Sequence, residues 1–246
     1  MIIHKPEIIR DGSNTIIRAL VEHKDRKEYL WFSTSREHEN WLTHETADAF
    51  VVAMLLSAML NKEDIHVEGV MSEKLFYNLT NYYMRIIVSS FPSLSRVGIF
   101  PERLASTIYT LGSGSVATGF SGGIDSFCVL ADHLFGSTPA GFKVTHLLFN
   151  NVGSHGAGGR RLFRERYNRI FPLVRELGLP SIVTDSNLDE MLSLDFLASH
   201  MPRNLAVPLL FQKLIRRVYY ASAYRYEDCF VGPTDSMGYS DPMAVH

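Results

Sequence analysis

The run Thr118-Gly-Phe-Ser-Gly-Gly-Ile-Asp-Ser126 constrains the fold of this 246-residue chain more than any other stretch. Apolar, β-prone residues from Val116 to Phe120 predict a strand. The Ser-Gly-Gly that follows predicts a tight turn, which opens a helix at Ile124 or Asp125. Backbone N–H groups of such a turn, together with those of the first helical turn, form a seat for a polyphosphate.

The acid in this run changes what the seat could bind. Asp125 would repel a bare anion, so a carboxylate there makes sense if Mg²⁺ bridges it to phosphate oxygens. No Gly-Lys-Ser/Thr is present in the chain, which excludes a phosphate loop of the Walker type. The alternative is an ordinary serine-glycine turn before an aspartate that caps a helix.

From Ser115 onwards, apolar strands alternate with helices. We expect strands at 116–120, 144–150, 181–184 and 228–231, and helices at 126–135, 160–177 and 205–224. Near-continuous apolar strands between helices predict a parallel sheet covered on both faces. Ligands of such sheets bind outside the carboxyl ends of the strands. The loops at 121–126, 150–161 and 232–241 should therefore meet at one edge.

Before Ser115 the sequence does not show this regular alternation of strands and helices. A hairpin should pair Ile16–Val21 with Tyr29–Ser33, and a helix capped by Thr43 or Thr46 should run to Asn61. A strand at 65–67, a helix at 73–88 and a strand at 97–100 follow. Because 101–114 ends in glycines and serines, we predict an N-terminal α+β module at 1–110 and a nucleotide-binding domain at 111–246.

The loop after the second strand of that domain holds four glycines and then Arg160 and Arg161. The glycines let the backbone approach a ligand, and both arginines could pair with phosphate oxygens. Arginines 164, 166 and 169 further along the helix are expected to face solvent. His155 could be a catalytic proton carrier or an exposed loop residue, and the exposed residue is the interpretation that the sequence favours.

Ser121–Ser126 matches in full the Ser-Gly-Gly-x-Asp-Ser signature of the PP-loop ATP pyrophosphatases. From Ser115 to Pro242 the chain resembles the branch of that family that is asparagine-synthetase-like and 7-cyano-7-deazaguanine-synthase-like. The resemblance implies a Rossmann-like, parallel five-stranded sheet with helices on both faces, as in adenine nucleotide alpha hydrolase-like folds. It also implies Mg²⁺-dependent cleavage of ATP between the α- and β-phosphates. AMP would pass to a carboxylate or amide oxygen of a small-molecule acceptor, with release of pyrophosphate, and an amine or ammonia would then displace AMP.

The resemblance also implies roles for residues of this chain. The phosphates would be held by Ser121, Gly122, Gly123, Ile124, Asp125 and Ser126, with Arg160, Arg161, Gly232 and Thr234 close by. Phe149 and Asn150 would contact the adenine. Asp125 and Asp235 would hold the Mg²⁺. Arg203, expected at the start of the penultimate helix, would neutralise charge on the leaving pyrophosphate.

The charge and the composition of the chain argue against several classes of function. A net charge of −2 shows no electrostatic footprint for bulk nucleic acid, which disfavours a tRNA-modifying enzyme of the same mechanism. Two cysteines cannot build a four-thiolate zinc site, and Cys128 and Cys229 are expected to be buried.

The N-terminus lacks a basic region followed by an apolar core, and no apolar run is long enough to span a bilayer, so we expect a cytoplasmic protein. A non-catalytic ATP-binding subunit or sensor stays open, as does a homodimer formed through the apolar helices of the first module.

Overall fold

A computed structural model describes residues 1–24, 26–106, 114–156 and 159–221 of the chain. Its strands are β1 (Ile2–Ile3), β2 (Glu7–Asp11), β3 (Asn14–His23), β4 (Arg26–Ser35), β5 (Ile65–Ser72), β6 (Ile99–Ala105), β7 (Ser115–Gly119), β8 (His146–Asn151), β9 (Ser181–Ser186) and β10 (Ile215–Tyr219). Its α-helices are α1 (Asp48–Asn61), α2 (Glu73–Asn78), α3 (Met84–Ser90), α4 (Ile124–Leu130), α5 (Gly159–Leu177), α6 (Leu188–Met191) and α7 (Phe196–Leu210). Short 3₁₀ helices lie at Arg36–Trp41 and Ala140–Phe142, and π-helical turns lie at Leu79–Tyr83 and Ala131–Phe135.

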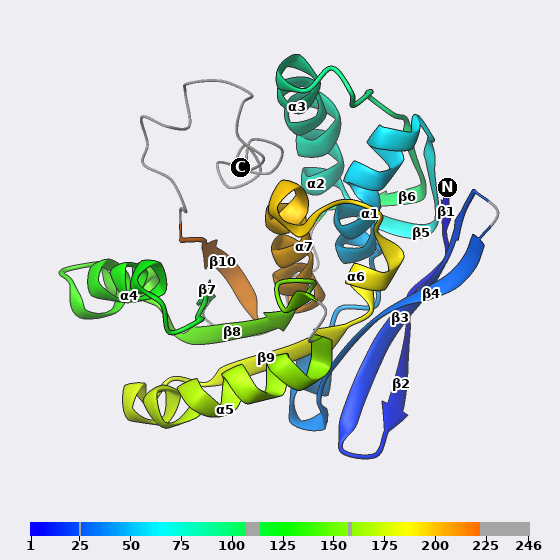
Figure 1. Cartoon of the computed structure of the whole chain (residues 1–246). Helices are drawn as coiled ribbons and strands as arrows, with labels where there is room; N and C mark the ends of the chain where they lie inside the picture. Colours follow the sequence, from blue (N-terminus) through cyan, green and yellow to red (C-terminus); the bar gives the residue numbers. More distant parts are fainter. Residues whose placement is uncertain (25, 107–113, 157–158, 222–246) are drawn as a thin grey trace.

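The described strands form one mixed, ten-stranded sheet in the order β10-β7-β8-β9-β4-β3-β1-β5-β6, with β2 paired to β3 (Figure 1). Strands β10, β7, β8 and β9 run parallel to one another. Strand β9 then pairs antiparallel with β4, and β5 pairs in parallel with both β1 and β6. The expected α/β class is confirmed, but the parallel strands are one part of a larger mixed sheet.

The hairpin near the N-terminus is confirmed as β3 and β4, which pair from Asn14–Ser35 to His23–Arg26. Along each of the two strands, buried residues alternate with partly exposed ones, as expected of a sheet covered on one face. Phe32 of β4 packs edge-on against Phe50 of α1, with ring centroids 5.8 Å apart. Helix α1 is buried along almost its whole length and also packs against α7.

The predicted cap of α1 is wrong. The N-cap residue is Ala47, and it makes no side-chain capping bond. The hydroxyls of Thr43 and Thr46 are buried and have no hydrogen-bond partner among the described residues. Buried Asp48 instead accepts bonds from the Ser72 backbone N–H and from Gln212, each at 2.9 Å. The first turn of α1 is therefore held by distant parts of the chain, which no local pattern could reveal.

The predicted helix at 205–224 is also wrong in its second half. Helix α7 ends at Leu210, and Ile215–Tyr219 forms strand β10 beside β7. This segment, Ile-Arg-Arg-Val-Tyr, contains the β-branched and aromatic residues that favour strands. The expected strand at 228–231 lies outside the described residues.

Helix α4 rests on a small apolar cluster of its own, formed by Phe120, Leu130, Val144, Leu147 and Val174. The large core lies elsewhere and includes residues from both the first hundred residues and the last hundred. The predicted boundary near residue 110 stays a prediction, although strands from both sides of it belong to one sheet. In the part of the chain that the structure describes, no helix combines the length and the apolar character needed to cross a membrane.

Candidate functional site

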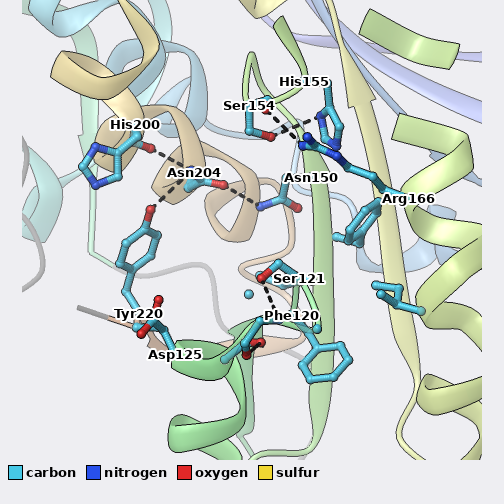
Figure 2. A pocket seen from close by; sticks show the side chains of 18 of the residues that line it. Phe120, Ser121, Asp125, Asn150, Ser154, His155, Arg166, His200, Asn204 and Tyr220 are labelled. Carbon is cyan, nitrogen blue, oxygen red and sulfur yellow. Dashed lines mark hydrogen bonds between the residues drawn. The ribbon is translucent and has the colours of Figure 1, made fainter. Parts of the chain in front are cut away.

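A cavity of about 720 Å³ lies where β7 and β8 end (Figure 2). The turn after β7 forms one side of it, and α5, α7 and the residues after β10 form the others. Its walls are built by Gly119, Phe120, Ser121, Gly122, Gly123, Asp125, Ser126, Leu148, Phe149, Asn150, Ser154, His155, Arg166, Arg169, Ile170, Phe196, Leu197, His200, Asn204, Tyr220 and Ala221. The structure thus brings the predicted phosphate turn and the predicted adenine-contacting residues Phe149 and Asn150 to one cavity.

The strand, turn and helix predicted around residues 116–126 are confirmed. Gly122 adopts a φ of +75°, and a Cβ atom there would lie 2.9 Å from Cγ2 of Ile170 on α5. Glycine is therefore required at this position both by its backbone conformation and by its neighbour. Gly123 caps α4, and its carbonyl accepts a 2.8 Å bond from the hydroxyl of Ser126. The unpaired N–H groups at the start of this helix are available to an anion.

Asp125 lines the cavity, is exposed, and has no ion-pair or hydrogen-bond partner among the described residues. One carboxylate together with phosphate oxygens is a usual ligand set for Mg²⁺, so Asp125 fits the expected metal. The described residues contain no group of three or more His, Cys, Asp or Glu side chains that could hold a metal by themselves. Ile124 is 76% exposed and does not line the cavity. Gly232, Thr234 and Asp235 lie outside the described residues.

The arginines of the cavity are not the predicted ones. Arg160 forms ion pairs with Asp185 and Glu190, and Arg161 pairs with Glu165 while its side chain stays 84% exposed. Neither residue lines the cavity.

Arg166 and Arg169 line it instead, and neither makes an ion pair with a carboxylate of the described chain. Helical spacing could have identified Arg166, because Phe163, Arg166 and Ile170 lie at i, i+3 and i+7, and Phe163 is buried.

His155 is a wall residue and not the exposed loop histidine that the sequence favoured. It is 6% exposed, and its ring packs edge-on against Phe163 with centroids 5.2 Å apart. Its Nδ1 lies 3.2 Å from Oδ1 of Asn151 and 3.1 Å from Oγ of Ser154. Burial lowers the pKa of His155, and the charge of Arg166 lowers it further, against a smaller opposing effect of Asp185.

The opposite wall is a polar network that sequence reasoning missed. Asn204 of α7 donates to the carbonyl of His200 at 2.8 Å and to the hydroxyl of Tyr220 at 3.4 Å. Its Oδ1 accepts from Nδ2 of Asn150 at 3.3 Å (Figure 2). Oδ1 of Asn150 is buried and has no hydrogen-bond partner in the described chain. An acceptor held in this way is available to a donor group of a ligand.

The expectation for Arg203 is wrong in its position. Arg203 lies in the middle of α7, is fully buried and does not line the cavity. Its guanidinium donates to Ser199, to Asp189, and to the carbonyls of Val152 and Leu194, all within 3.0 Å. Arg203 therefore ties α6 and α7 to the segment after β8.

The expectation for Cys128 is also wrong, because Cys128 is a free and exposed thiol. It lies on α4 between residues that are partly buried, Phe127 and Val129, and so points to the outer side of the helix. Cys229 lies outside the described residues.

Comparison of the chain with protein-family models, with curated proteins and with solved structures found no match. The site must therefore be interpreted from its own geometry.

Proposed function

We propose that this protein is a Mg²⁺-dependent ligase that cleaves ATP between the α- and β-phosphates and transfers AMP to an oxygen of a small acceptor. A single observation carries the proposal. The turn at 121–126 presents an unpaired carboxylate, Asp125, to the same cavity as two arginines without acidic partners, Arg166 and Arg169. A polyphosphate with its bridging cation matches this combination of charges, whereas an uncharged ligand would leave all three groups without an opposite charge.

Different residues of the cavity would bind the phosphates and the Mg²⁺. Ser121, Gly122, Gly123 and Ser126 would hold the β- and γ-phosphates, with the helix N-terminus adding donors and a favourable dipole. Asp125 would hold Mg²⁺, which when bound offsets the negative charge that develops on the phosphates. Arg166 and Arg169 would take the place that we expected of Arg160 and Arg161. These cationic groups would stabilise the departing pyrophosphate.

The wall of Leu148, Phe149 and Asn150 would receive the adenine. Phe149 is stacked on Phe163 of α5, with centroids 5.1 Å apart, so the apolar surface beside the end of β8 is held in place. The unpartnered Oδ1 of Asn150 could accept a hydrogen bond from the exocyclic amino group of the base. This wall and the phosphate turn share one cavity, as the binding of a single nucleotide requires.

The finer features of the fold belong to the same proposal. We propose that 228–231 adds a fifth parallel strand to β10, β7, β8 and β9, giving the Rossmann-like sheet that the signature implies. Gly232 and Thr234 would then stand near the phosphates, and Asp235 would offer a second carboxylate to Mg²⁺. An amine or ammonia would displace AMP from the adenylated acceptor, which makes a C–N bond.

The test uses ATP labelled on the α-phosphate, Mg²⁺ and a small-molecule cell extract as the source of acceptor and amine. We expect labelled AMP from the wild-type protein and none from Asp125→Asn. Asp132→Asn is the matched control, because Asp132 is an exposed carboxylate that lies after α4, outside the cavity. Labelled ADP that depends on Asp125, or AMP formation that survives Asp125→Asn, would refute the proposal.

A further inference from the structure

A chain of hydrogen bonds sets the orientation of the buried histidine. Nδ2 of Asn151 donates to Oδ1 of Asp185 at 2.6 Å, and a carboxylate oxygen can only accept. The side-chain amide of Asn151 is thereby fixed with its oxygen toward His155, whose Nδ1 lies 3.2 Å away. Because that oxygen is also only an acceptor, Nδ1 must carry a proton. The neutral imidazole therefore has its lone pair on Nε2.

This chain is anchored at both ends. Asp185, at the end of β9, also accepts a bond from Nε of Arg160 at 3.1 Å, so its carboxylate is held away from the cavity. The backbone carbonyl of Asn151 accepts from the hydroxyl of Ser186 at 2.7 Å, which joins β8 to β9. The imidazole is wedged against the ring of Phe163. The ring of His155 is therefore held in one orientation by strand ends and by α5.

Nε2 of His155 makes no hydrogen bond within the described chain, although the residue lines the cavity. Figure 2 shows His155 and Arg166 on the same side of the cavity, above the turn that carries Ser121 and Asp125. Burial lowers the pKa of the imidazole, the charge of Arg166 from α5 lowers it further, and the opposing effect of Asp185 from β9 is the smallest of the three. At neutral pH the ring is therefore uncharged, and its basic nitrogen is available to a ligand in the cavity.

We propose that His155 is the catalytic base that takes the proton from the attacking amine during the second half of the reaction. In that step the amine nitrogen forms a bond to the carbonyl carbon of the adenylated acceptor. The bond from this carbon to the AMP oxygen breaks, and its electron pair leaves with AMP. The proton released by nitrogen passes to Nε2 of His155. Asn151 is a positioning residue, since it selects the tautomer without touching the reactants. This inference rests on the proposed function.

The test separates the two halves of the reaction in the same extract. Exchange of labelled pyrophosphate into ATP measures adenylation, and labelled AMP measures the completed transfer. Because the base acts only after adenylation, we expect His155→Gln to retain exchange and to lower AMP formation about 100-fold. His66→Gln is the control, because His66 is an exposed histidine of β5 outside the cavity.

A pH profile distinguishes a base from a merely structural histidine. His155 must be neutral to accept a proton, so AMP formation should fall as the pH falls through its pKa, below the ordinary imidazole value of 6.5. The residual AMP formation of His155→Gln should lack this dependence on pH, because glutamine has no titratable group at the position of the imidazole. Nitrogen NMR of the imidazole-labelled wild-type protein should show the tautomer protonated at Nδ1.

Any of the following results would overturn the inference and leave the proposed function standing: AMP formation by His155→Gln at the wild-type rate, a pH profile unchanged in His155→Gln, or an imidazole protonated at Nε2. Loss of pyrophosphate exchange in His155→Gln would also overturn it, since the histidine would then serve adenylation. A wild-type protein that forms no labelled AMP and shows no exchange would instead refute the proposed function, and this role with it.

Discussion

At the scale of single residues, the phosphate turn depends on a glycine that no other residue could replace without strain. Gly122 has a φ of +75°, and the space where a side chain would begin is occupied by Ile170. The close approach of α5 to the turn brings Arg166 and Arg169 to the cavity, so the missing side chain of Gly122 is a condition for the cationic wall.

Gly122→Ala should therefore weaken ATP binding at least tenfold. Its left-handed backbone costs about 1 kcal/mol or more with a Cβ, and the contact with Ile170 pushes the turn away from α5. Equilibrium dialysis with labelled ATP and Mg²⁺ measures the effect. Gly141→Ala is the matched control, because no atom lies within 4 Å of a Cβ there. Unchanged binding by Gly122→Ala would mean that the turn does not hold the nucleotide.

At the scale of elements, α5 shows how a helix divides arginines between structure and binding. Arg160 is held by acids of β9 and α6, and its guanidinium also lies 5.0 Å from the ring centroid of Trp31. Arg166 and Arg169, two to three turns further along, lie on the face that meets the cavity. Arg160 thus stabilises the start of the helix, whereas Arg166 and Arg169 give the cavity its positive charge.

Arg166→Gln and Arg169→Gln should each weaken ATP binding about tenfold, because each removes a charge-assisted contact to phosphate. The loss should be smaller at high salt, since both side chains are exposed and screened. Arg161→Gln, which removes an equal charge from the same helix outside the cavity, should leave binding unchanged. A loss of the same size in all three variants would point to net charge and not to a phosphate site.

Helix α7 is positioned by Arg203, and this role makes a prediction about stability. Arg203→Met should lower the free energy of unfolding by about 3 kcal/mol, because it leaves the carbonyls of Val152 and Leu194 and the Asp189 carboxylate without their donor. Urea denaturation at constant pH measures the loss. Arg203→Lys should recover little of it, since an ammonium cannot reproduce the fork of four contacts. A variant with near wild-type stability would show that these bonds are replaceable.

At the scale of the whole molecule, the pairing of β4 with β9 merges two strand systems into one sheet. Buried Asp48, at the N-terminus of α1, also connects the two parts of the chain, because it accepts a hydrogen bond from Gln212, which lies two residues after the end of α7. The large apolar core crosses the same junction. The parts of the chain before and after residue 110 therefore stabilise each other through a shared sheet and a shared core.

We expect a single cooperative unfolding transition. Both tryptophans, Trp31 and Trp41, lie in the first part of the chain, so their fluorescence reports on that part. Far-ultraviolet circular dichroism reports on all helices, α4, α5 and α7 included. The two signals should change at the same urea concentration, as for a two-state unit. Separate midpoints would show that the predicted modules fold independently.

Features that depend on local chemistry could be predicted from the order of the amino acids. Glycine at a positive φ, alternation in the β3–β4 hairpin and apolar strands between helices all follow from the conformational limits of single residues and from the period of each element. These features placed the turn at 121–126 at the end of a strand and at the start of a helix, as the structure has it. The family resemblance singled out Phe149 and Asn150, which line the same cavity, and their contact with adenine stays a prediction. Period-based reasoning failed at Ile215–Tyr219, where pairing with β7 outweighed the helical pattern.

Which side chains share the cavity depends on how distant segments pack against one another. Whether Arg160 or Arg166 faces a ligand depends on which face of α5 meets the turn, and that contact joins Gly122 to Ile170, 48 positions further along the chain. The burial of His155 and of Arg203 likewise depends on partners that come from other elements. A local pattern records the period and the backbone preference of each segment. It does not record the packing of one segment on another, and this packing assembles the site.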